Sequence, residues 1–147
     1  SILHEQLTSQ MNSIQHQVRQ APQKRIFLEI WDAPLLTVGG KSFINDIVFR
    51  AGGQNVASGI HADYTPSDME ALYAYNPDIY VVVTHSNNNF RSLISRPELA
   101  NLAAVQNNQV FQITSDVLTR PGPRSFQGLL QLAKIIHPDI MQYGEHQ

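Results

Sequence analysis

The first twenty residues carry apolar side chains at helical spacing. These side chains belong to Leu3, Leu7, Met11, Ile14 and Val18. Positions three or four apart share one face of a helix, and the positions between them are polar and rich in glutamine. The pattern therefore predicts an amphipathic helix over residues 2–20. Pro22 cannot continue the helix and marks its end.

Three short apolar runs follow, and each predicts a buried strand. They span residues 25–31, 78–84 and 109–113, and residues typical of turns bound each run. The run at 78–84 is almost continuously apolar, which is typical of a parallel strand covered on both faces. Helical patterns lie between the runs. The sequence thus predicts an α/β fold, a three-layer α/β/α sandwich with a mainly parallel sheet.

Polar residues at the starts of two helical segments predict caps. Ser42 is the expected N-cap of a helix that buries Phe43 together with the apolar residues that follow it. Ser67 and Glu70 have the spacing of a capping box, so Ser67 is the expected N-cap of the next helix. Residues 32–40 and the segment around Tyr64 are expected to be loops.

The remaining chain predicts three shorter features. Residues 55–57 are expected to form a brief strand, and Pro97 is expected to begin a helix that runs to about Val105. Another helix is expected after Pro123. Its buried face would carry Phe126, Leu129, Leu130, Ala133 and Ile136.

Composition narrows the classes of function. The net charge is −2, so no excess of positive charge indicates nucleic acid or an anionic membrane as a partner. The chain contains no cysteine, which excludes disulfides, thiolate metal sites and cysteine nucleophiles. No apolar run approaches the length of a membrane span. The chain starts at Ser1 without the regions of a signal peptide, so we expect a processed or truncated product.

Motifs of common enzyme classes are missing from the sequence. Residues 39–42 (Gly-Gly-Lys-Ser) resemble the end of a phosphate-binding loop, but Leu35 stands where that loop needs glycine. There is no Gly-x-Ser-x-Gly motif and no pair of carboxylates at adjacent strand ends. His61 and Asp63 lie close together, but two residues do not make a metal site. We therefore expect a protein that is not an enzyme and has no metal site.

Two aromatic residues and one histidine are candidates for ligand binding. Trp31 ends a predicted strand, where ligand crevices of α/β proteins open, but a tryptophan there is equally expected in the core. Tyr64 lies in a polar segment, where its ring can stack on a large flat ligand. His85 lies just past the strand at 78–84. The other histidines, among them His137, are expected at surface or capping positions.

Two arginines flank a rigid turn. Arg120 and Arg124 lie on either side of residues 121–123 (Pro-Gly-Pro). Two fixed guanidinium groups can grip a carboxylate or a phosphate through paired hydrogen bonds. The alternative is a turn into a helix with solvated charges, and the sequence leaves both interpretations open.

Five ordered segments together resemble a family of binding proteins. The segments are 30–40, 43–46 with 51–55, 67–72 with 76–78, 104–110, and 120–124 with 137–138. Singly each motif is weak, but the ordered set is specific. It resembles the C-terminal lobe of the periplasmic proteins that bind cobalamin or iron complexes for ABC importers. The resemblance extends from about residue 22 to 139.

The resemblance implies a domain organisation and a function. Residues 1–21 resemble the end of a helix that joins two lobes, and residues 22–147 resemble the C-terminal α/β lobe, with the N-terminal lobe absent. The implied ligand is cobalamin or a related corrinoid, with a ferric siderophore or haem as the next choice, and no resident cofactor. The implied partner is an ABC importer permease. The implied location is the periplasm, or the outer surface of a Gram-positive cell through a lipid anchor.

The resemblance also assigns roles to particular residues. Tyr64 stands where vitamin B12-binding relatives place a tryptophan that packs against the corrin. Glu70 resembles the glutamate through which this lobe docks on permease arginines. The Trp31 to Thr37 segment and the segment after Val83 line the cleft in the family. The turn with Arg120 and Arg124 lies near the cleft.

The sequence leaves three alternatives open. One is a zinc or manganese receptor of similar fold, for which only His85 is a suitable ligand. Another is an enzyme domain of nitrogenase-like architecture, which the lack of cysteine disfavours. A third is a module that only binds other proteins. An exposed apolar stripe on the first helix would also favour self-association.

Overall fold

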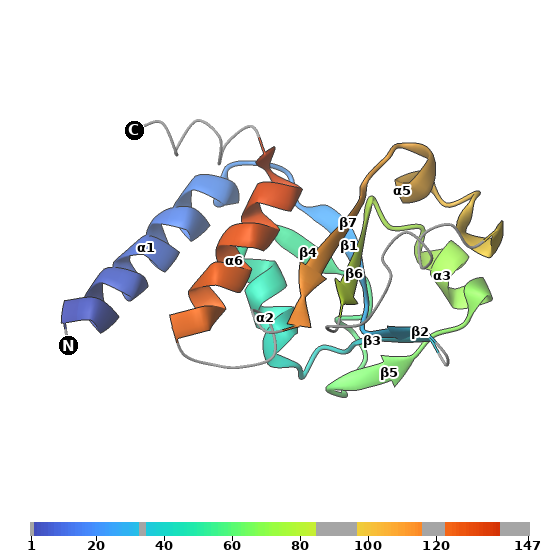
Figure 1. Ribbon diagram of the computed structural model, residues 1–147, viewed down its shortest axis with the longest axis horizontal. Helices are drawn as coiled ribbons and strands as arrows, with labels where there is room; N and C mark the ends of the chain where they lie inside the picture. Colours follow the sequence, from blue (N-terminus) through green and yellow to red (C-terminus); the bar gives the residue numbers. More distant parts are fainter. Residues whose placement is uncertain (1, 33–34, 85–96, 116–122, 139–147) are drawn as a thin grey trace.

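The computed structural model describes residues 2–32, 35–84, 97–115 and 123–138. A parallel sheet with helices on both faces forms its centre (Figure 1). The predicted three-layer α/β/α architecture is thus confirmed.

The central sheet contains four parallel strands in the order β4-β1-β6-β7. These strands are β1 (Lys24–Glu29), β4 (Gly53–Asn55), β6 (Ile79–Thr84) and β7 (Val110–Thr114). Strands β1 and β6 lie in the middle, and their register pairs Ile26 with Ile79 and Glu29 with Val82. The three strands predicted from apolar runs are therefore confirmed to within two residues at each end. The brief strand expected at 55–57 instead ends at Asn55.

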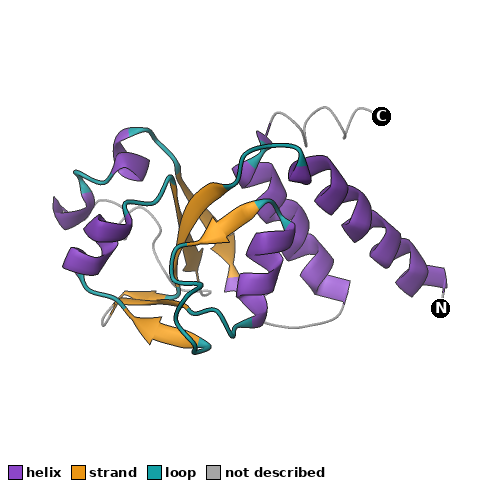
Figure 2. Cartoon of the chain, turned by 180° about the vertical axis from the view of Figure 1, so that it is seen from behind, coloured by secondary structure: helices purple, strands orange, loops and turns teal. Residues whose placement is uncertain are grey.

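Two apolar clusters cover the two faces of the sheet, because neighbouring residues of a strand point to opposite faces. One cluster contains Ile26 and Leu28 of β1 and lies under α1 (Ile2–Arg19), α2 (Phe43–Arg50) and α6 (Pro123–Ile136). The other contains Phe27 of β1 and lies under α3 (Met69–Tyr75), the 3₁₀ helix η1 (Pro97–Leu99) and α5 (Ala103–Gln106). The two groups of helices flank the strands in Figure 2.

Helix α1 packs on the lobe through its last turns. It covers Ile2–Arg19, close to the predicted span. Ile14 and Val18 are buried against α6 and the sheet, as the apolar stripe predicts. The side chains of Leu3, Leu7 and Met11 lie outside the described part of the structure.

A second, smaller sheet corrects the expectation of loops at 32–40 and around Tyr64. Strands β2 (Trp31–Asp32), β3 (Leu35–Val38) and β5 (Tyr64–Pro66) form an antiparallel sheet in that order. The sequence hides it because the strands are only two to four residues long, too short to establish an alternating pattern.

The N-cap of α2 was predicted correctly, but the burial of its first helical residue was not. The Ser42 hydroxyl accepts a hydrogen bond from the Ile44 amide at 3.1 Å, as an N-cap does. Phe43 was expected in the core, yet it is 38% exposed, whereas Ile44 and Ile47 are buried. Only the face of α2 that turns toward the sheet is covered.

The helix expected from Pro97 to about Val105 is interrupted. It consists of η1 and, after a gap, the single turn of α5. The last helix, α6, matches the prediction and buries Leu129, Ala133 and Ile136. The Phe126 side chain lies outside the described residues.

His137 is not the surface or capping residue that was expected. It is only 5% exposed, and its Nε2 lies 3.1 Å from the Gly52 carbonyl oxygen. Gly52 has a φ of +88°, and a methyl group there would approach the His137 ring to 2.6 Å. The imidazole therefore ties the end of α6 to the turn between α2 and β4.

Gly39 and Gly40 allow the segment 57–63 to fold against the end of β3. The amides of Gly39 and Gly40 donate to the carbonyl oxygens of Asp63 and Ile60 at 2.9 and 2.8 Å. A methyl group on Gly39 would lie 2.1 Å from the Ala62 carbonyl oxygen. This close approach of two backbones fixes the path that leads into β5 and Tyr64.

We expect Gly39→Ala to destabilise the lobe by about 2 kcal/mol or more, because backbone atoms must move to admit the methyl group. Gly59→Ala is the matched control, since a methyl group there would meet nothing within 4 Å. Urea unfolding followed by circular dichroism measures both changes. Equal stability of the two variants would contradict the close approach.

Candidate functional site

The carboxyl edge of the central sheet is the candidate site. Strands β1, β6 and β7 end there at Glu29, Thr84 and Thr114, and the small sheet lies across the same end of the lobe (Figure 1). Ligands of open α/β sheets bind beyond the carboxyl ends of the strands, where the connecting segments diverge. The small sheet therefore forms a wall of any site at this edge.

Two large rings project from one face of the small sheet. Trp31 pairs with Leu36 in β3, and Tyr64 pairs with Val38 two residues further along the same strand. Direct partners share a face of a pleated sheet, so Trp31, Leu36 and Tyr64 belong to one face. Trp31 is 50% exposed and Tyr64 is 45% exposed. The exposure of Trp31 rules out the interpretation as a core residue.

The opposite face of the small sheet is buried. Leu35 and Thr37 alternate with Leu36 along β3, and both are covered by the lobe. Asn55 holds this arrangement: its amide nitrogen donates to the Val38 carbonyl oxygen at 2.7 Å and to Asn45 Oδ1 at 3.1 Å. Val38 shares the face of Leu36 and Tyr64 and is also fully buried, so that face is covered at Val38 and exposed at Trp31 and Tyr64.

A buried acid ends β1, two residues before Trp31, and the sequence analysis missed it. Glu29 is 2% exposed, and one carboxylate oxygen accepts a hydrogen bond from the Tyr80 hydroxyl of β6. The Tyr80 ring is fully buried and stacks on Phe27 with ring centroids 5.3 Å apart. The available signal was the single charged residue near the end of an apolar run, because such a residue is buried only when it has a partner.

Glu70 lies at the surface near the start of α3, as expected. The capping box, however, was wrong. The N-cap is Asp68, whose carboxylate accepts a hydrogen bond from the Ala71 amide at 2.7 Å, while the Ser67 hydroxyl donates to the Asp68 carbonyl oxygen at 3.3 Å. Ser67 and Asp68 are both good caps, and their adjacency made the sequence ambiguous. Glu70 is therefore free of the capping role.

The other predicted site residues are not brought to the site by the described structure. His85 and Arg120 lie outside the described residues. Arg124 belongs to the first turn of α6, but its side chain is also outside them. Their assignment as ligand-binding residues stays a prediction.

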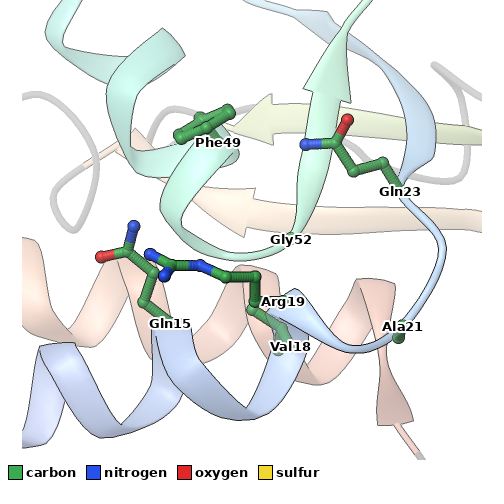
Figure 3. A pocket seen from close by; sticks show the side chains of 7 residues that line it. All are labelled: Gln15, Val18, Arg19, Ala21, Gln23, Phe49 and Gly52. Carbon is green, nitrogen blue, oxygen red and sulfur yellow. The ribbon is translucent and has the colours of Figure 1, made fainter.

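A hollow of about 260 Å³ lies away from the predicted site residues. It opens between the last turns of α1, the end of α2 and the chain before β1 (Figure 3). Val18 and Gly52 are its buried floor, and Arg19 and Phe49 are exposed at its sides. Among the predicted site residues whose side chains the structure describes, which are Trp31, Tyr64 and Glu70, none lines it.

Among the described residues, no three acidic or histidine side chains come together in a way that could hold a metal ion. None of the described helices has the length and apolar character needed to cross a membrane.

Comparison with known proteins gives a consistent family. The sequence profile of the periplasmic binding proteins matches residues 3–117. A vitamin B12-binding protein of Vibrio vulnificus is 27% identical over 126 residues, which cover 84% of this chain and 45% of that protein. An uncharacterized ABC transporter substrate-binding lipoprotein of Bacillus subtilis is 27% identical over 121 residues, which cover 82% of this chain and 38% of that protein. The chain spans less than half the length of these relatives.

Solved structures agree on the fold. A periplasmic binding protein from Veillonella parvula is 25% identical and superposes with a TM-score of 0.79, over 91% of this chain and 49% of that one. A periplasmic haem-binding protein from Roseiflexus is 20% identical and superposes with a TM-score of 0.78, over 94% of this chain and 55% of that one. The second likeness is evidence for the fold alone.

We expect Asp68→Ala to lower the free energy of unfolding by about 1 kcal/mol, because the Ala71 amide loses its acceptor. Ser67→Ala should change it by less than about 0.5 kcal/mol. Urea unfolding of both variants checks the assignment. A larger loss from Ser67→Ala would restore the capping box and with it a structural role for Glu70.

Proposed function

The chain belongs to the periplasmic binding protein family, and on that premise we propose that it is the C-terminal lobe of a two-lobe substrate-binding protein. In this proposal residues 1–21 are the end of the helix that joins the lobes and residues 22–147 are the lobe itself. The ligand is cobalamin or a related corrinoid, or else an iron complex such as a ferric siderophore or haem.

The pair of exposed rings at the carboxyl edge carries the proposal. Trp31 and Tyr64 project from the same face of the small sheet and are each about half exposed. Aromatic faces bury large flat ligands well, and a site built on paired strands holds them in place. A relative is named for binding vitamin B12, a ligand with a large ring system, and this supports the proposal.

The direction of α1 is consistent with a second lobe opposite this edge. Helix α1 starts toward the end of the lobe at which the small sheet lies and leads away from it into β1 (Figure 1). A chain that enters through α1 therefore comes from the side of the carboxyl edge. A cleft between two lobes would then be lined on this side by the small sheet.

A protein of this kind needs docking charges and no catalytic groups. We propose that Glu70, which is exposed and takes no part in the N-cap, contacts arginines of an ABC importer permease. The protein would work in the periplasm, or as a lipoprotein on the cell surface, and carry no resident cofactor. Self-association through α1 stays a prediction that sedimentation can test.

Because the lobe supplies only one wall, we expect the isolated chain to bind cyanocobalamin or haemin weakly or not at all. A single wall leaves much of a large ligand in water, whereas tight sites bury most of its surface. Isothermal calorimetry on the 147-residue chain tests this. Submicromolar affinity would mean that this lobe holds a complete site.

In the protein expressed from the complete reading frame, Tyr64→Ala should weaken ligand binding by about 1–3 kcal/mol, because a ring that stacks on the ligand is lost. Tyr73→Ala is the control: Tyr73 is also exposed, at 37%, but lies on α3, where its hydroxyl donates to the Glu98 carbonyl oxygen. Titration monitored by ligand absorbance compares them. Equal affinities for the two variants would remove Tyr64 from the site.

Glu70→Gln and Glu70→Arg should impair uptake in cells while ligand affinity stays normal, and the charge reversal should be worse because it places like charges together. Glu98→Arg is the control, since Glu98 is exposed in η1 and has no proposed contact with the permease. Radiolabelled ligand uptake measures the effect. Normal uptake by a folded Glu70→Arg protein would refute docking through this residue.

A further inference from the structure

Glu29 and Tyr80 form a buried polar pair at the point where the chain leaves the central sheet. Strand β1 ends at Glu29, and β2 begins at Trp31 with a single residue between them. The Ile30 amide donates to the Leu36 carbonyl oxygen at 2.8 Å, which joins this bend to β3. The bend thus sets the direction in which Trp31 emerges.

The pair holds the last residue of β1, immediately before this bend, to the neighbouring strand β6. The Tyr80 ring is held on Phe27 by stacking and has no exposed surface, so its hydroxyl cannot reach water. A buried hydroxyl needs an acceptor, and a buried carboxylate needs a donor. Each group of the pair meets the other's need. An aliphatic residue at position 29 would leave the Tyr80 hydroxyl without this acceptor.

We infer that Glu29 is a positioning residue, which acts through the bend to fix the direction in which the Trp31 ring projects from the ligand-binding face. The inference rests on the proposed function, because it gives Trp31 a role at the cleft. It explains why a charged residue lies within the buried end of β1, two residues before the exposed ring. It also adds a determinant of ligand affinity that does not touch the ligand.

The single tryptophan of the chain makes the inference testable without any ligand. Trp31 is the one tryptophan among 147 residues, so the fluorescence of the chain reports on this ring alone. Tyr80→Phe removes the hydroxyl and keeps the stacked ring. Glu29→Ala removes the acceptor, whereas Glu29→Gln keeps an acceptor oxygen of similar reach.

The expected result is a selective release of Trp31. Tyr80→Phe and Glu29→Ala should speed the decay of Trp31 anisotropy and raise iodide quenching, by about twofold at most because the ring is already half exposed. Glu29→Gln should restore values close to those of the natural chain. His137→Ala is the control, since it removes a buried polar contact to Gly52 at another place in the lobe. It should lower the melting temperature and leave Trp31 unchanged.

One result would overturn the inference. If Tyr80→Phe and Glu29→Ala lower the melting temperature as His137→Ala does, but leave the anisotropy and quenching of Trp31 unchanged, the pair only stabilises the core. Because no ligand is present, this outcome would leave the proposed uptake function intact. If the proposed function is wrong instead, Trp31 should respond to the substitutions as expected, but the complete protein should bind none of the ligands.

Discussion

Burial of β1 and β6 on both faces is the constraint from which the rest of the structure follows. All six residues of β6 and the last four of β1 are buried. Each large apolar side chain removed from water contributes about 1.5–3 kcal/mol, against about 1 kcal/mol net for a single hydrogen bond. Helices must therefore cover both faces of the sheet. Because the helices connect parallel strands, all strands point the same way and their carboxyl ends lie at one edge.

The site is a consequence of that edge. Once the strands end together, the chain after β1 turns back as β2 and β3, and β5 joins them across the end of the lobe. Leu35 and Thr37 on one face of the small sheet pack on the lobe, and the other face carries Trp31 and Tyr64. The lobe thus places exposed aromatic rings at the edge where α/β proteins bind ligands, without any mobile part being required.

Elements that form because apolar side chains are buried were predicted from the sequence. The small sheet, which forms through pairing between short strands, was not. The run at 78–84 is apolar throughout and was identified correctly, as was the Ser42 cap. The small sheet was missed because its strands are too short to show an alternating pattern, and because β3 also pairs with β5, which lies far from it in the chain. Tyr64 was a candidate because it is an aromatic residue in a polar segment, and the family resemblance supported that choice; its position in a strand was not predicted, and its role as a site residue stays a prediction.

Other errors arose where two local interpretations compete. Ser67 and Asp68 are adjacent residues of equal capping ability, and only the hydrogen bond to the Ala71 amide distinguishes them. His137 became a buried residue because Gly52 leaves room for its ring. The hydrogen bond between Glu29 and Tyr80 was missed for another reason. Tyr80 lies in another strand, so no pattern within one segment of the sequence predicts that the two residues are partners.

The aromatic face at the carboxyl edge is proposed to be one wall of a ligand cleft. Hydrogen–deuterium exchange of the complete protein, with and without cyanocobalamin, haemin or a ferric hydroxamate siderophore, tests it most directly. The ligand that binds should slow exchange in residues 30–38 and 60–66, and leave the hollow formed by α1, α2 and the turn at Gly52 unchanged. Protection at that hollow, with none in the small sheet, would contradict the claim.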